Sequence, residues 1–95
     1  PWPKAVDGLY EDVEIPDALY SSPEIFDAHP EFMKKSMYRQ RFFCRWDRPE
    51  KFRTNLRAYY RMISGIDGVI ARVRGKLSEK KLAGNTVIIF SGDNG

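Results

Sequence analysis

The stretch that decides how this chain is interpreted is residues 86–95, which read Thr86-Val87-Ile88-Ile89-Phe90-Ser91-Gly92-Asp93-Asn94-Gly95. Its first half is β-branched and aromatic, which predicts a buried β-strand. A carboxylate and a carboxamide, Asp93 and Asn94, then stand side by side at the carboxyl end of that strand. Ligands of open α/β sheets bind beyond the carboxyl ends of the strands. Asp93 and Asn94 are therefore candidate metal ligands.

The chemistry of this pair favours Ca²⁺. Asp93 offers charged oxygens and Asn94 a neutral carbonyl oxygen, which hard cations prefer, whereas Zn²⁺ favours nitrogen and sulfur. Gly92 and Gly95 let the backbone turn around the pair. A Ca²⁺ site needs about six to eight oxygens, so the pair is only part of a site. We therefore expect the chain to be a piece of a longer protein.

A long amphipathic helix is predicted over residues 49–81. Pro49 suits the first helical position, and Glu50 suits the positive end of the helix dipole. Gly65 and Gly68 fall within the pattern and are expected to let a neighbouring element approach closely. Apolar residues recur every three or four positions on one face, namely Phe52, Leu56, Tyr59, Tyr60, Ile63, Ile66, Val69, Ile70, Val73 and Leu77.

The order of helix, turn, apolar strand and polar strand tip predicts an α/β fold. Gly84 is the expected stop of the helix. A single strand leaves its backbone donors and acceptors unpaired, so its partners are expected outside this sequence or in another copy of the chain. The isolated chain is therefore expected to self-associate.

Residues 1–48 are predicted to be mostly irregular and to lie across another element. Five of the six prolines fall within residues 1–33, and each disfavours helix at the residue before it. Ser22 and Pro23 suit the N-cap and first position of a single helical turn. A short helix is also expected within residues 31–47.

Charge is unevenly distributed along the chain, although the net value is only +3. Residues 1–33 carry one lysine and eight acids, a net charge of −7, and residues 34–81 carry fifteen basic residues and four acids, a net charge of +11. This asymmetry indicates an acidic segment lying over a basic one, or a basic face that meets an anionic partner. The longest apolar run is Val87–Phe90, far short of the ~20 residues of a membrane span, so no membrane segment is expected.

The residues from about 59 to 95 resemble the sulfatase family, within the alkaline-phosphatase-like superfamily. The resemblance rests on the aromatic pair and aliphatic–Asp step within Tyr59–Ile70, and on the apolar strand that ends in Asp93-Asn94-Gly95. Gly92 stands where family members often have Ser or Thr. The resemblance implies a fragment of an alkaline-phosphatase-like α/β sandwich. Its parts would be a substrate-side segment over 1–48, the helix over 49–81, and the strand and metal motif over 86–95.

The resemblance also implies a function. Sulfatases hydrolyse sulfate esters, so a sulfated small molecule or glycan is the implied substrate. The family holds Ca²⁺ with carboxylates and an Asp-Asn pair, which Asp93 and Asn94 match. Its nucleophile is a formylglycine made from a Cys/Ser-x-Pro/Ala-x-Arg motif, which this chain lacks. The 95-residue piece is therefore expected to be inactive, with the nucleophile and most of the Ca²⁺ ligands supplied by sequence outside it.

The strongest rival signal is the basic, aromatic stretch 39–48. Its arginines and aromatics can bind phosphates and bases, or sulfated sugars, or pack with the rings inward and the arginines outward. A module that binds nucleic acid or sulfated polysaccharide is thus the alternative function. No nucleic-acid motif accompanies the stretch, so no nucleic-acid partner is expected. The individual roles of Arg39, Arg41, Arg45 and Arg48 stay open.

Three further residues are interpreted as structural. Cys44 lacks the formylglycine motif around it and is expected to be a partly buried thiol. His29, the single histidine, is expected to pack or to lie in a loop, because no acid or nucleophile is spaced to work with it. Asp67 is expected to face solvent or to pair with a nearby arginine.

Overall fold

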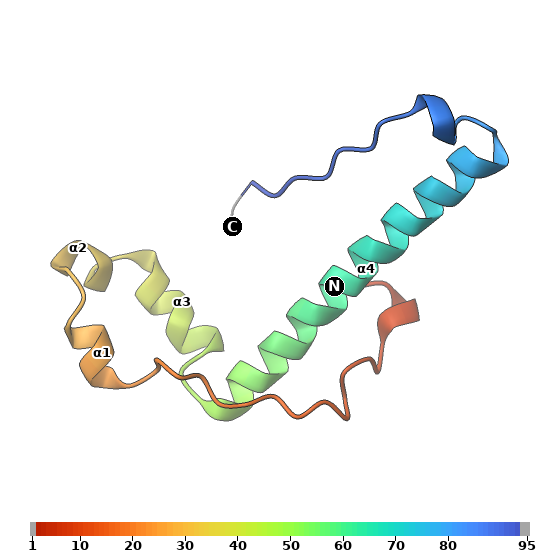
Figure 1. Ribbon diagram of the computed structural model, residues 1–95. Helices are drawn as coiled ribbons and strands as arrows, with labels where there is room; N and C mark the ends of the chain where they lie inside the picture. Colours follow the sequence, from red (N-terminus) through yellow and green to blue (C-terminus); the bar gives the residue numbers. More distant parts are fainter. Residues whose placement is uncertain (1, 94–95) are drawn as a thin grey trace.

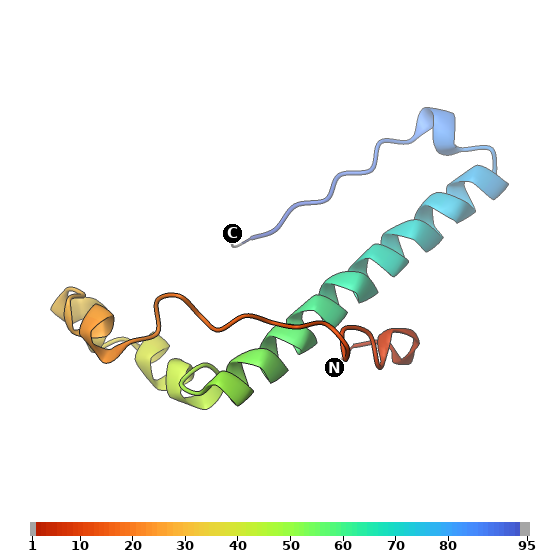
Figure 2. The same ribbon diagram turned by 60° about the horizontal axis from the view of Figure 1, so that its bottom comes forward.

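The computed structural model describes residues 2–93, which form four α-helices and two short 3-10 helices. Figure 1 shows α4 as a long rod, with α1, α2 and α3 gathered near the end where it begins. The N-terminal residues run beside the first half of α4, as Figure 1 and Figure 2 both show. The elements are η1 (Lys4–Val6), α1 (Pro23–Asp27), α2 (Glu31–Lys34), α3 (Met37–Arg45), α4 (Pro49–Glu79) and η2 (Ala83–Asn85).

No β-strand is present within residues 2–93, so the prediction of an α/β sandwich with a core strand is wrong. The segment of the predicted strand nevertheless runs as an extended trace after η2 (Figure 1), starting from Thr86 with φ −131° and ψ 129°. A strand also requires backbone hydrogen bonds to a neighbouring strand. Residues 86–90 make none to the rest of the described chain. The sequence pattern predicted the local conformation correctly, but it could not supply a partner.

Helix α4 begins at Pro49, as the sequence predicts, and ends at Glu79 rather than at residue 81. Proline at the first position gives up a backbone donor that would be unpaired there in any case, and Glu50 lies in the positive first turn. With 31 residues the helix is about 46 Å long. It is therefore the longest element of the described residues, and other segments can pack along it.

The C-terminal end of α4 is a Schellman motif. Lys81 takes the left-handed conformation with φ 57°, and its N–H donates to the Ser78 carbonyl at 2.9 Å. The N–H of Leu82 donates to the Leu77 carbonyl, also at 2.9 Å. These bonds satisfy carbonyls that the last helical turn would otherwise leave unpaired. The prediction that Gly84 stops the helix is wrong, because the reversal occurs at Lys81.

The three short helices α1, α2 and α3 precede α4 in the chain, and polar contacts join α3 to α4. Ser22 and Pro23 open α1 as the sequence predicts. Between α3 and α4, the Lys51 ammonium donates to the Phe43 carbonyl at 2.7 Å and to the Asp47 carboxylate at 2.8 Å. The hydrogen bond from Lys51 stabilises the charged form of Asp47 and holds the pKa of its carboxyl below the ordinary value.

Residues 2–17, called here the N-terminal strap, lie along α4 and are held by three arginines. Arg53, Arg57 and Arg61 are spaced by four residues, so they share one face of the helix. Each Nε donates to a strap carbonyl. In the order of the arginines, the acceptors belong to Ile15 (3.3 Å), Tyr10 (2.9 Å) and Leu9 (2.9 Å). We call these three residues the arginine ladder.

Two ladder arginines also pair with strap acids. Arg53 lies 2.6 Å from the Asp17 carboxylate, and Arg61 pairs with Glu11. The prediction that the acidic segment lies over a basic one is therefore confirmed along this part of α4. The charge asymmetry of the sequence is in part neutralised within the fold.

The strap is packed against α4 as well as hydrogen-bonded. Ile15 is the single buried apolar side chain of the described residues, with 4% of its surface exposed. Gly65 is buried, and a Cβ built there would lie 2.8 Å from Cδ of Pro3. The predicted close approach is thus confirmed at Gly65. It is wrong at Gly68, where a Cβ would have no neighbour within 4 Å among residues 2–93.

Tyr10 fixes the turn in the middle of the strap. Its φ of 67° is left-handed, which costs a residue other than glycine about 1–2 kcal/mol. Its hydroxyl shares a 2.6 Å hydrogen bond with the Ser64 hydroxyl, and its ring centre lies 5.6 Å from that of Tyr60. These contacts with α4, together with the bond from Arg57, offset the cost. Tyr59 is 52% exposed and takes little part.

The chain buries little of its apolar surface. Its radius of gyration is 18.7 Å, compared with about 12 Å for a compact 95-residue domain. Four positions of the α4 apolar face, Ile63, Ile66, Val69 and Val73, are each 45–47% exposed. Among the helices of residues 2–93, none has the length and apolarity needed to cross a membrane.

Candidate functional site

The segment that leads to the candidate metal ligands extends from η2. The Thr86 hydroxyl donates to the Leu82 carbonyl at 2.9 Å, which fixes the start of the segment against the turn. Ile88 is 45% exposed and lines a hollow of about 500 Å³ beside the last turns of α4. Its neighbours Val87 and Ile89 are 86% and 87% exposed. This alternation is the period of two that extended backbone imposes on side chains.

Asp93 stands at a bend beyond this segment and is exposed. Within residues 2–93, no three or more His, Cys, Asp or Glu side chains come close enough together to hold a metal ion. Asn94 lies outside the described residues. The carboxylate of Asp93 is the right donor type for Ca²⁺, but one carboxylate fills only a small part of its coordination shell. The described residues thus fit one position of a Ca²⁺ site, not the whole site.

The other chemically notable side chains do not gather around Asp93. Cys44 is exposed on α3, so the expectation of a partly buried thiol is wrong. His29 is half-buried, and its Nδ1 lies 3.3 Å from the Phe26 carbonyl oxygen, which confirms a packing role. Asp67 is exposed to solvent, as expected. None of these residues forms a nucleophile–base pair.

The basic, aromatic stretch 39–48 uses much of its aromatic surface within the fold. The guanidinium carbon of Arg39 lies 3.3 Å from the ring centre of Phe26 and 4.4 Å from that of Phe43. Trp46 packs edge-on against Phe52, with ring centres 5.9 Å apart. Rings in such contacts are less available to stack on nucleic-acid bases. The packing interpretation of this stretch is therefore the one that the contacts support.

The arginine ladder was not predicted from the sequence, where only the apolar face of this helix was identified. The signal was present in the sequence. Three arginines recur with a spacing of four, and an acidic segment of opposite charge precedes them. Their partners are mostly backbone carbonyls, however. Every residue has a backbone carbonyl, so the sequence does not show which ones will accept a hydrogen bond.

Comparison with known families decides the class of the chain. A model of the sulfatase family matches residues 7–95. The chain belongs to the sulfatase family. The resemblance that residues 59–95 carry is thereby confirmed. The match begins within the strap, so the strap from residue 7 onward and helices α1 to α3 are part of the sulfatase region and not a separate module. No curated protein and no solved structure matches the chain.

Proposed function

We propose that this sulfatase chain works as part of a sulfuric ester hydrolase, in which Asp93 and Asn94 each give oxygen to a bound Ca²⁺. The family match supports hydrolysis of sulfate esters as the activity of the whole enzyme. The observation that carries the metal assignment is the state of Asp93. It follows an extended segment, is exposed, and has no cation paired with it in the described part of the chain.

The chemistry divides between this chain and the rest of the enzyme. Bound Ca²⁺ would neutralise the sulfate group and the charge that develops as the S–O bond breaks. The chain's own part is to present Asp93 and Asn94, with η2 and α4 fixing the start of the segment that bears them. The formylglycine nucleophile and the remaining ligands would come from elsewhere, because this sequence has no motif for the nucleophile.

The substrate we propose is a sulfated small molecule or glycan, in keeping with the family. The alternative, a basic aromatic module for polyanions, has less support. Two ladder arginines already pair with acids of the same chain. Phenylalanine rings lie against the guanidinium of Arg39, so its faces are not free to stack on nucleic-acid bases. We therefore do not advance nucleic-acid binding as a second function.

A calcium titration of the 95-residue chain tests the metal assignment. We expect binding in the millimolar range or weaker, because two ligands leave most of the coordination shell to water. Backbone amide shifts in nuclear magnetic resonance should change around residues 91–95 and little elsewhere. Asp93→Ala should abolish these changes.

Asp67→Ala is the matched control, since Asp67 is also an exposed aspartate but lies on α4. It should leave the titration unchanged. Micromolar affinity that survives Asp93→Ala would show that Ca²⁺ binds elsewhere and would sink the assignment.

A further inference from the structure

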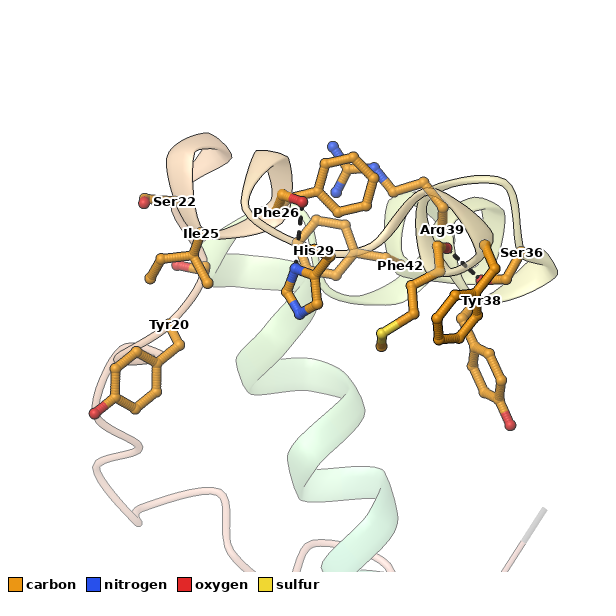
Figure 3. A pocket seen from close by; sticks show the side chains of 12 residues that line it. Tyr20, Ser22, Ile25, Phe26, His29, Ser36, Tyr38, Arg39 and Phe42 are labelled. Carbon is orange, nitrogen blue, oxygen red and sulfur yellow. Dashed lines mark hydrogen bonds between the residues drawn. The ribbon is translucent and has the colours of Figure 1, made fainter.

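An aromatic pocket of about 440 Å³ lies among α1, α2 and α3, on residues that the proposed metal site does not use. This volume falls within the usual range of small-molecule sites. Six of its twelve lining residues carry rings. They are Tyr20, Phe26, His29, Phe32, Tyr38 and Phe42. Figure 3 shows Tyr20 and Ile25 on one side and Tyr38 on the other, with the His29 ring between them.

The pocket has a half-buried floor and an exposed rim. Phe26, His29, Arg39 and Phe42 are half-buried, as expected of a floor that the helices hold in place. The rim rings are much more exposed: Tyr20 by 80%, Tyr38 by 79% and Phe32 by 76%. A flat apolar occupant would remove these rings from water, which favours its binding.

The charge of the residues that line the pocket determines whether it favours an anionic or a cationic ligand. Among the described residues 2–93, Arg39 is the one lysine or arginine that lines it, and no aspartate or glutamate does. Glu24 and Asp27 belong to α1 but are not among the lining residues. On the neighbouring helix, Glu31 is already paired with Lys34 at 3.2 Å. An anionic ligand would thus meet a positive charge in the pocket and no opposing carboxylate.

The state of Arg39 makes it a suitable anion-binding group. Phe26 and Phe43 cover its guanidinium, with ring centres 3.3 Å and 4.4 Å from the guanidinium carbon. The N–H donors of a guanidinium lie in its plane, so stacking on its faces does not use them. Within residues 2–93 no carbonyl or carboxylate accepts a hydrogen bond from Arg39, in contrast to the arginine ladder. The rings hold the group in place and leave its donors free for a ligand.

We propose that this pocket binds an organic anion with a flat, apolar body. The rings of the floor and rim enclose the body, and Arg39 binds the anionic group. The site requires neither Asp93 nor Ca²⁺ nor the hydrolytic reaction, so it is additional to the proposed function and stands or falls separately from it.

The single histidine makes the test selective, because the imidazole C–H signals of His29 come from the pocket alone. Naphthalene-2-sulfonate is titrated into the 95-residue chain without metal, and the proton resonances of His29 are followed. We expect a saturable ring-current shift. Neutral naphthalene-2-sulfonamide, which has the same ring system and nearly the same size, should bind about tenfold more weakly.

Two variants locate the anionic group. Arg39→Gln should raise the dissociation constant of the sulfonate about tenfold and remove its advantage over the sulfonamide. Arg41→Gln is the matched control, since it removes the same charge from α3 at a residue that does not line the pocket. It should leave the constant unchanged. Circular dichroism verifies that each variant keeps its helices, and the comparison of the two probes on the wild-type chain needs no variant at all.

Three results would overturn the proposal. One is the absence of a His29 shift at millimolar sulfonate. The second is equal binding of the sulfonate and the sulfonamide by the wild-type chain. The third is an equal loss of affinity in Arg39→Gln and Arg41→Gln, which would indicate attraction by overall charge and not a site.

Discussion

At Arg57 one guanidinium joins two carbonyl oxygens of the strap, that of Tyr10 at 2.9 Å and that of Val13 at 3.2 Å. Its donors form a rigid fork, so one side chain can hold two points of an irregular segment at once. A lysine could not reproduce this, because its ammonium is a compact point charge. The arginine ladder thereby gives the strap a defined path without a strand or helix of its own.

Loss of Arg57 should therefore loosen the strap. Arg57→Ala removes two charge-assisted hydrogen bonds, which together contribute about 1–3 kcal/mol in a partly exposed setting. Hydrogen exchange followed by mass spectrometry should show residues 9–15 exchanging about tenfold faster or more, since ~1.4 kcal/mol is a factor of ten. Arg72→Ala is the control, because Arg72 is exposed on the same helix. Equal protection of residues 9–15 in the two variants would contradict a role for Arg57.

Single residues also show what a sequence can and cannot predict. The position of the acidic strap over the basic helix α4 was predictable, because charged side chains can be identified directly from the sequence. The ladder's carbonyl partners were not, and neither was the left-handed Lys81, because a lysine gives no signal for that conformation. Asp93 was identified as a candidate ligand from its place after an apolar run, and that assignment remains a proposal.

At the scale of elements, the fit between strap and helix depends on one glycine. Gly65 lies where Pro3 crosses α4, while a Cβ at Gly68, three residues further on, would meet nothing within 4 Å in the described part of the chain. An alanine is about 1 kcal/mol better than a glycine within a helix. Alanine substitutions at the two positions therefore distinguish the effect of intrinsic helix stability from the effect of contact with the strap.

Gly68→Ala should stabilise α4 by up to about 1 kcal/mol, because nothing opposes the added methyl group. Gly65→Ala should instead displace the strap, since the methyl group would lie 2.8 Å from a ring atom of Pro3. Thermal unfolding by circular dichroism measures the first effect, and amide exchange over residues 2–8 measures the second. If both variants stabilised the chain equally and left exchange unchanged, the crossing of Pro3 over Gly65 would be refuted.

The elements also differ in how well they could be predicted. Helix α4 follows from a long apolar period with proline and glutamate at its start, and such a pattern is local. The sandwich does not follow, because pairing of residues 86–90 is a non-local property that depends on a neighbouring backbone. The sequence thus predicted an extended segment correctly and a sheet wrongly for residues 2–93.

The solvent-accessible surface area of the whole molecule is larger than that of a typical folded monomer of the same mass. The accessible surface is 8,382 Å², compared with about 5,700 Å² for a folded monomer of 11.1 kDa. The excess is comparable to the total area buried in a substantial protein–protein interface. Much of it is apolar, on α4 and on the extended segment.

We therefore expect the 95-residue chain to self-associate at micromolar concentration. The extended segment presents both apolar side chains and unpaired backbone groups, which together recruit another chain. Ile89→Lys should weaken association in sedimentation velocity, because Ile89 is 87% exposed and therefore has little internal packing to lose. Leu19→Lys, at an equally exposed position outside the segment, is the control. A stable monomer with slow amide exchange over residues 86–90 would show that the chain needs no partner.

The central claim is that Asp93 is a metal ligand of a sulfatase, and the complete enzyme provides its most direct test. The measurement is the hydrolysis of a sulfate ester by the enzyme bearing Asp93→Ala, with the Ca²⁺ content determined on the same sample and Asp67→Ala as control. Loss of a direct ligand should lower activity by more than the 10- to 100-fold that loss of an outer-sphere partner typically causes, and should lower bound Ca²⁺. Asp67→Ala should match the wild type in both. Full activity and full Ca²⁺ content in Asp93→Ala would contradict the account.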